Sequence, residues 1–191
     1  MILFVGCSFT WGAGLQFEYL SKKRGWTSDE INAINPPKSH LEHLDYKCDE
    51  YRKKYHYPNL VAKKMNMAYG LGKLGNGGNN YEIAKILEHT AMELSGAEPI
   101  ELVVIQFTDW TRSCPEIYNR AASDGTDNTD FLSNDHIKRI ISTQIDKINF
   151  GCEQHLKSKW IGWSWRNDLA QVLKTKYPKN FIPLYHKGKE Y

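Results

Sequence analysis

The chain has 191 residues, of which 41% are hydrophobic, 25% charged and 13% aromatic. This length is typical of one domain with its own core, and the many aliphatic and aromatic residues argue against disorder. The net charge of +3 is too small, and the lysines are too dispersed, to predict nucleic-acid binding. No apolar run approaches the roughly 18 residues that a membrane-spanning helix needs.

The four cysteines, Cys7, Cys48, Cys114 and Cys152, form no CxxC pair, so the sequence predicts neither a zinc site nor a redox motif. The N-terminal residues lack the basic segment and the long apolar stretch of a signal peptide. We therefore expect a cytoplasmic protein with reduced thiols, in the host cytoplasm if the source is viral.

Short apolar runs alternate with amphipathic stretches along the chain. Residues 2–6 form a continuous apolar run typical of a strand buried on both faces. Residues 21–57 are polar, contain two adjacent prolines and indicate an inserted excursion. The other expected elements are a helix beginning within 11–20, a helix from Pro58, a strand at 67–71, a helix at 80–94, a strand at 102–107, a loop at 109–133, a helix at 134–156, a strand at 159–165, a helix at 167–176 and a strand at 181–185.

This alternation predicts an α/β protein, namely a three-layer α/β/α sandwich around a five-stranded parallel, flavodoxin-like sheet. We expect one domain over residues 1–191, with the excursion at about 21–57 and the loop at about 109–133. In open parallel sheets, ligands bind beyond the carboxyl ends of the strands. The loops that follow the strands are therefore where chemistry is expected.

The loop after the first strand, residues 6–10, carries the sharpest signal. Ser8 lies just beyond a strand-ending glycine, where it can present its hydroxyl at the sheet edge and its backbone N–H to an oxyanion. In the loop after the second strand, Gly77 could offer a backbone N–H and Asn80 a side-chain amide. The structural alternative is that the polar residues of both loops cap helix starts, and both roles can hold at once.

Three segments together resemble the SGNH/GDSL hydrolase superfamily, in the phage-type subgroup with a GCSFT first block. Gly-Cys-Ser-Phe-Thr at 6–10 is similar to the first block, Gly-Gly-Asn-Asn-x-x-Ile at 77–83 to the second, and the strand at 103–112 to the third. The resemblance implies a serine hydrolase for a small ester or an acylated carbohydrate. It also implies that Ser8 is the nucleophile and that the N–H groups of Ser8 and Gly77 form the oxyanion hole.

The chain departs from the family pattern in two blocks. Asp109-Trp110 stands where the family has its Gly-x-Asn-Asp asparagine, which leaves Asn80 as the candidate third donor. The family's Asp-x-x-His block corresponds to Pro183-Leu184-Tyr185-His186, which has the histidine but lacks the aspartate and the helix that follows it. Four alternatives stay open. His186 acts as a lone base in an impaired hydrolase, the gene is truncated, a partner chain supplies the helix and the histidine, or the chain is an inactive SGNH-fold binding or phage-associated protein.

Aromatic and charged residues gather at the same predicted edge, and we assign substrate binding to five of them: Trp11, Asp109, Trp110, Arg112 and Trp165. Indole rings suit sugar faces or acyl groups, and Arg112 and the nearby Arg166 could hold an anionic group, although core packing and simple solvation are the alternatives.

No cofactor and no metal are predicted. The GxGxxG pattern at 70–75 does not open directly into a helix, and HLEH at 40–43 does not match the HExxH zinc motif. The expected partner is a small-molecule ester or glycan rather than nucleic acid or membrane, with homo-oligomer formation left open.

Overall fold

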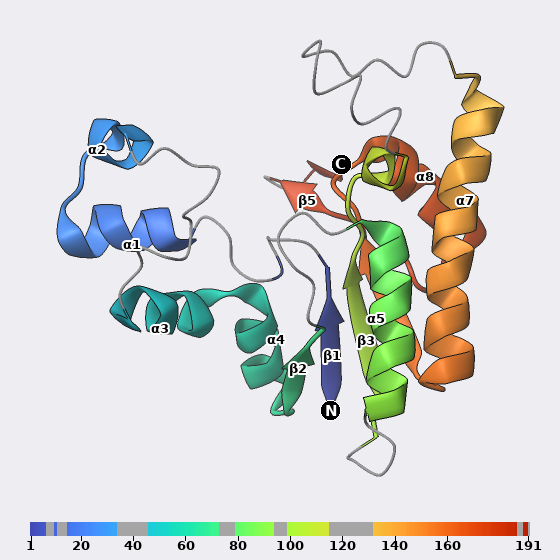
Figure 1. Ribbon diagram of the computed structural model, residues 1–191, viewed down its shortest axis with the longest axis horizontal. Coiled ribbons are helices and arrows are strands. Elements are labelled where there is room, and N and C mark those ends of the chain that lie inside the picture. Colours follow the sequence, from blue (N-terminus) through green and yellow to red (C-terminus); the bar gives the residue numbers. More distant parts are fainter. Residues whose placement is uncertain are drawn as a thin grey trace. The chain divides into compact units, whose positions relative to one another are not determined.

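The structure is a computed structural model that describes residues 1–6, 10, 15–33, 46–72, 79–93, 99–114, 132–186 and 189–190. The chain forms two compact units, one made of Met1–Cys7 with Ala68–Tyr191 and the other of Ser8–Met67. The first unit contains the sheet and the second is helical (Figure 1). The predicted excursion at 21–57 falls within the second unit.

The first unit is α/β with a parallel sheet, as predicted. Its main sheet has the strand order β2-β1-β3-β4, and all neighbouring strands are parallel. This order matches the first four positions of the doubly wound order 2-1-3-4-5. The elements are β1 (Ile2–Val5), β2 (Tyr69–Leu71), α5 (Asn80–Glu93), β3 (Leu102–Gln106), the 3-10 turn η1 (Trp110–Ser113), α7 (Asn134–Phe150), its π-helical continuation η2 (Gly151–His155), β4 (Lys159–Trp163), α8 (Asn167–Lys176), β5 (Tyr185–His186) and β6 (Lys189–Glu190).

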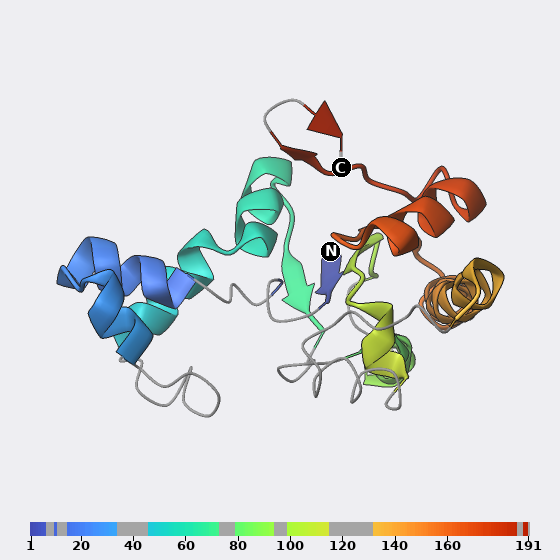
Figure 2. The same ribbon diagram turned by 90° about the horizontal axis from the view of Figure 1, so that it is seen from above.

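The core lies between one face of this sheet and its helices. All four residues of β1 are buried, which confirms the strand buried on both faces that its apolar run predicts. Helices α5 and α7 lie on the same side of the sheet (Figure 2). The cluster formed there by strands and helices includes Leu3, Val5, Val103 and Ile105 from the strands and Ile83, Leu87, Ile141, Ile145 and Ile148 from the helices.

The predicted fifth strand at 181–185 is wrong. Phe181 forms only an isolated parallel bridge with Gly162, flanked by backbone hydrogen bonds of 2.7 and 2.8 Å. The ring of Pro183 fixes the φ angle of this residue at about −65°, away from the roughly −120° of a parallel strand. In addition, β4, the strand with which this segment would pair, ends at Trp163. The chain then pairs Tyr185–His186 antiparallel with β6 in a separate two-stranded sheet.

The described part of the second unit consists of helices: α1 (Leu15–Arg24), α2 (Ser28–Ala33), α3 (Tyr46–Tyr55) and α4 (Tyr57–Met65). Pro58 lies in the first turn of α4, as its position in the sequence predicts. Helices α1 and α3 meet through Tyr19 and Tyr51, whose ring centroids are 5.4 Å apart. Among the described helices of both units, none is long and apolar enough to cross a membrane.

Replacing Gly162 with alanine tests the close packing of β4. An added Cβ would lie 2.6 Å from Cε2 of Phe107, a buried ring, and 3.1 Å from the Ile105 carbonyl oxygen. We expect Gly162→Ala to lower the free energy of unfolding by about 1–3 kcal/mol, measured by urea denaturation. Gly70→Ala is the matched control, because its Cβ would meet only ordinary contacts at 3.6 and 3.8 Å. Equal effects of the two substitutions would contradict this account.

Candidate functional site

The candidate site is the carboxyl edge of the sheet next to β1 and β3. The chain leaves β1 toward β2 and later returns to β3 on the other side of β1. This reversal is the topological switch point, where doubly wound sheets bind their ligands. The described residues closest to it in sequence are Gly6, which follows β1, and Phe107 to Asp109, which follow β3.

The start of α5 places two adjacent asparagines in different roles. The Asn79 side chain accepts a hydrogen bond from the Glu82 backbone N–H at 3.0 Å, and Glu82 accepts one from the Asn79 N–H at 3.0 Å. This reciprocal pair is a capping box, so the helix start is satisfied without Asn80. The side chain of Asn80 therefore turns inward, where it is fully buried.

A buried amide network ties this helix to the loop after β3. Asn80 Oδ1 accepts a hydrogen bond from the Thr108 backbone N–H at 2.9 Å, and Asn80 Nδ2 donates to the Thr108 carbonyl at 3.3 Å and to Gln144 Oε1 at 2.7 Å. Gln144, on α7, donates to the Trp110 carbonyl at 3.1 Å. Asn80 and Gln144 are 0% exposed and Thr108 is 1% exposed, so each broken bond would leave a buried polar group unsatisfied.

The hydrogen bonds of the Asn80 side chain to Thr108 and Gln144 give this residue a structural role. Both hydrogens of its Nδ2 are donated to protein acceptors. No N–H of this amide remains for an oxyanion, in contrast to the donor role expected from the sequence. Asn80 instead fixes the loop after β3 relative to the start of α5.

Asp109 is held by two separate sets of partners. Its Oδ1 accepts hydrogen bonds from the backbone N–H of Thr111 at 3.0 Å and from the Thr111 hydroxyl at 2.9 Å, which caps η1. Its Oδ2 lies 3.6 Å from Nη1 of Arg166. The carboxylate predicted to contact substrate is therefore engaged by a helix cap and a cation.

Trp110 is a core residue, which corrects its assignment to substrate binding. Its side chain is 0% exposed and its indole Nε1 donates to Asp168 Oδ2 at 2.6 Å. A ring enclosed in this way cannot contact a ligand. The sequence places Trp110 at the sheet edge, but the 3-10 turn that follows β3 carries the ring back into the core.

Asp168 connects this tryptophan with Arg166 at the start of α8. Arg166 Nη2 donates to Asp168 Oδ2 at 3.1 Å, and the backbone N–H of Leu169 donates to Oδ1 at 2.8 Å. Burial raises the pKa of the Asp168 carboxyl, but the hydrogen bonds from Arg166 and Trp110 outweigh it and hold the pKa below its usual value.

Three of the remaining predicted site residues lie in the described part of the chain and three lie outside it. Trp165 is 50% exposed in the loop after β4, where a ligand can reach it, and Arg112 is half-buried in η1. The backbone of His186 lies in β5. Ser8, Gly77 and Trp11 lie outside the described residues.

Gln144 and Asp168 are not among the predicted site residues, whereas Arg166 is expected there only as a residue that could hold an anion. Gln144 had a usable signal, since it interrupts the apolar stripe of Ile137, Ile141 and Ile148 on α7. A lone amide at such a position indicates a buried polar partner. The contacts of Asp168 with Trp110 depend on how α8 packs, and the sequence carries no comparable signal for them.

No metal site is found among the residues that the structure describes, since no three His, Cys, Asp or Glu side chains there could hold an ion. The HLEH segment at 40–43 is outside the described residues. Cys48, Cys114 and Cys152 are free thiols, and burial raises the pKa of Cys114 and Cys152.

In comparisons with protein-family models, curated proteins and solved structures, nothing matches this chain.

Removing the Asn80 amide should destabilise the protein through the groups left unpaired. We expect Asn80→Ala to lower the free energy of unfolding by about 2–3 kcal/mol and to speed hydrogen exchange of the Thr108 N–H. A double-mutant cycle with Gln144→Ala should give a coupling energy of about 0.5–3 kcal/mol. Gln171→Ala, at an exposed position of α8, is the control and should stay within about 0.5 kcal/mol of the wild type. If the losses of unfolding free energy caused by the Asn80 and Gln144 substitutions simply add, the two side chains do not act together and the proposed network is wrong.

The Asp168 carboxylate should contribute stability that depends on pH. Because its folded-state pKa is lowered, the contribution is present above the ordinary value of 3.8 and is lost as the pH falls through the lowered folded value. We expect Asp168→Asn to cost about 1–2 kcal/mol at pH 7 and progressively less toward pH 3, measured by urea unfolding across this range. Asp135→Asn, which makes none of these contacts, is the control. A constant difference between wild type and Asp168→Asn at all pH values would contradict this account.

Proposed function

We propose that the chain is an SGNH-type serine hydrolase for a small ester or an acylated carbohydrate. The observation that carries the proposal is topological. Ser8 follows β1, the strand at the switch point of the sheet, and only Gly6 and Cys7 separate it from the end of that strand. In this proposal Ser8 attacks the acyl carbon, and the N–H groups of Ser8 and Gly77 stabilise the oxyanion.

The contacts of Asp109 support this proposal against one objection. An ionised aspartate facing the oxyanion would oppose the developing negative charge. Here one oxygen of Asp109 caps η1 and the other lies 3.6 Å from the guanidinium of Arg166. The cap orients the carboxylate, and Arg166, which also pairs with Asp168, offsets part of its charge, so that Asp109 is not an unpartnered negative charge at this edge.

His186 is the proposed general base. The chain runs parallel to β4 at Phe181, so it continues toward the carboxyl edge of the sheet. Figure 1 shows β5, which contains His186, at the end of the sheet where β1 and β3 also terminate. A serine without a base is a poor nucleophile, and this histidine is the one that the family resemblance assigns.

An inactive binding protein on the same fold is the second candidate. One observation favours it: Pro183 occupies the position where the family has the aspartate of its Asp-x-x-His block. That aspartate normally orients the histidine, and without it the histidine ring lacks a fixed tautomer. Such a protein would bind a glycan or ester without turning it over.

Covalent labelling distinguishes the two candidates. We expect a fluorophosphonate probe to modify Ser8, detected by peptide mass spectrometry, and a p-nitrophenyl ester to be hydrolysed. Ser8→Ala should abolish both, and His186→Ala should lower kcat by about ten-thousandfold. Ser21→Ala, at an exposed position on α1, is the control and should behave as the wild type. Hydrolysis that persists in Ser8→Ala would refute the proposal, and an unlabelled, inactive wild type would favour the binding protein.

A further inference from the structure

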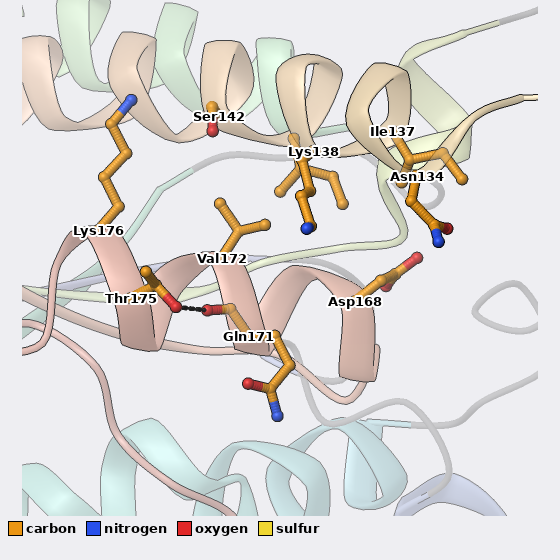
Figure 3. Close-up of a pocket in the computed structure, with 10 residues that line it drawn as sticks. Asn134, Ile137, Lys138, Ser142, Asp168, Gln171, Val172, Thr175 and Lys176 are labelled. Atoms are coloured by element: carbon orange, nitrogen blue, oxygen red, sulfur yellow. Dashed lines mark hydrogen bonds between the residues drawn. The ribbon is translucent and has the colours of Figure 1, made fainter.

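A groove of about 850 Å³ separates α7 from α8 on the surface of the first unit. Its apolar walls are formed by Ile137 and Ile141 of α7 and by Val172 of α8. Figure 3 shows Val172 pointing toward α7, and Lys138 extending from α7 toward α8. Ile137 and Val172 are only partly buried, so apolar surface remains open to a ligand. The volume falls within the range of about 300–1,000 Å³ that is usual for small-molecule sites.

The dimensions of the groove fit an elongated molecule. Its lining on α7 runs from Asn134 to Ser142, which corresponds to about 12 Å of helical rise. The lining on α8 runs over an equal stretch, from Asp168 to Lys176. Both helices begin at the same end of the groove, where Asn134 and Asp168 approach each other (Figure 3).

Each charged side chain that lines the groove has an ion-pair partner, with one exception. Asp168 is bound by Trp110 and Arg166. Lys176 donates to Asp146 at 2.6 Å. Within the described part of the chain, no ion-pair partner is found for Lys138. The groove therefore combines an apolar body with one lysine, Lys138, for which no ion-pair partner is found among the described residues.

We propose that this groove binds a linear aliphatic carboxylate of medium chain length. The carboxylate pairs with Lys138, near the ends where α7 and α8 begin and where the helix dipoles also favour a negative charge. The alkyl chain lies along Ile137 and Val172, where it removes apolar surface from water. A cationic amphiphile would fit the same apolar wall but would face Lys138, and the one carboxylate in the lining is already engaged by Arg166.

The test uses the intact chain with decanoate and with decyltrimethylammonium, both below their micelle concentrations and at one fixed ionic strength. Methyl NMR should show saturable shifts of Ile137, Ile141 and Val172 with decanoate and much weaker binding of the cation. Lys138→Glu should weaken decanoate binding by about fivefold or more. Lys179→Glu changes the net charge equally at an exposed position outside the lining and is the matched control.

Val172→Phe provides a second variant, because it fills the groove without adding charge. We expect it to abolish the decanoate shifts of the Ile137 methyls while the circular dichroism spectrum stays that of the wild type. The proposal fails if decanoate shifts none of these methyls, if both amphiphiles bind equally, or if Lys138→Glu and Lys179→Glu weaken binding to the same extent. The measurement requires no turnover, so it is independent of the hydrolase proposal.

Discussion

The side chain of Asn80 pairs with both backbone groups of Thr108, much as a neighbouring strand would. This pairing occurs just beyond β3, where the parallel ladder has ended and the backbone groups need other partners. Gln144 completes the arrangement from α7, so that three elements far apart in the sequence are joined at one buried point. These directional hydrogen bonds fix the positions of the residues at the carboxyl edge of the sheet, because the apolar contacts of the core below it have no preferred direction.

A second group of contacts extends this order toward α8. Arg166 lies between Asp109 and Asp168, and the latter also receives the indole N–H of Trp110. The side chains of Arg166 and Asp109 are 16% and 17% exposed, so their ion pair is shielded from solvent more than a surface pair would be. The loop after β3 is thus held from one side by neutral amides and from the other by charges.

The parallel α/β architecture could be predicted from the sequence, because buried strands and amphipathic helices have distinct apolar periods. The apolar run at 2–6 and the helix at 167–176 are examples, and the latter begins and ends where expected. The last strand was mispredicted because Phe181 and Tyr185 carry strand-like side chains, whereas Pro183 and the early end of β4 decide the pairing. At the site, residue type indicated that Asn80 and Asp109 matter. It did not indicate that their hydrogen-bonding capacity is used within the protein, since this depends on partners distant in sequence.

The central position of β1 has a consequence for synthesis of the chain. Ile2 pairs with Tyr69 on one side and with Leu102 on the other, so its second neighbour is encoded about 100 residues later. At translation rates of about 5–20 residues per second, the four apolar residues of β1 wait roughly 5–20 s before β3 has been made. During that interval β2 is the only one of the two strands neighbouring β1 that has been made, and the helical unit of Ser8–Met67, whose contacts are closer in sequence, is complete earlier.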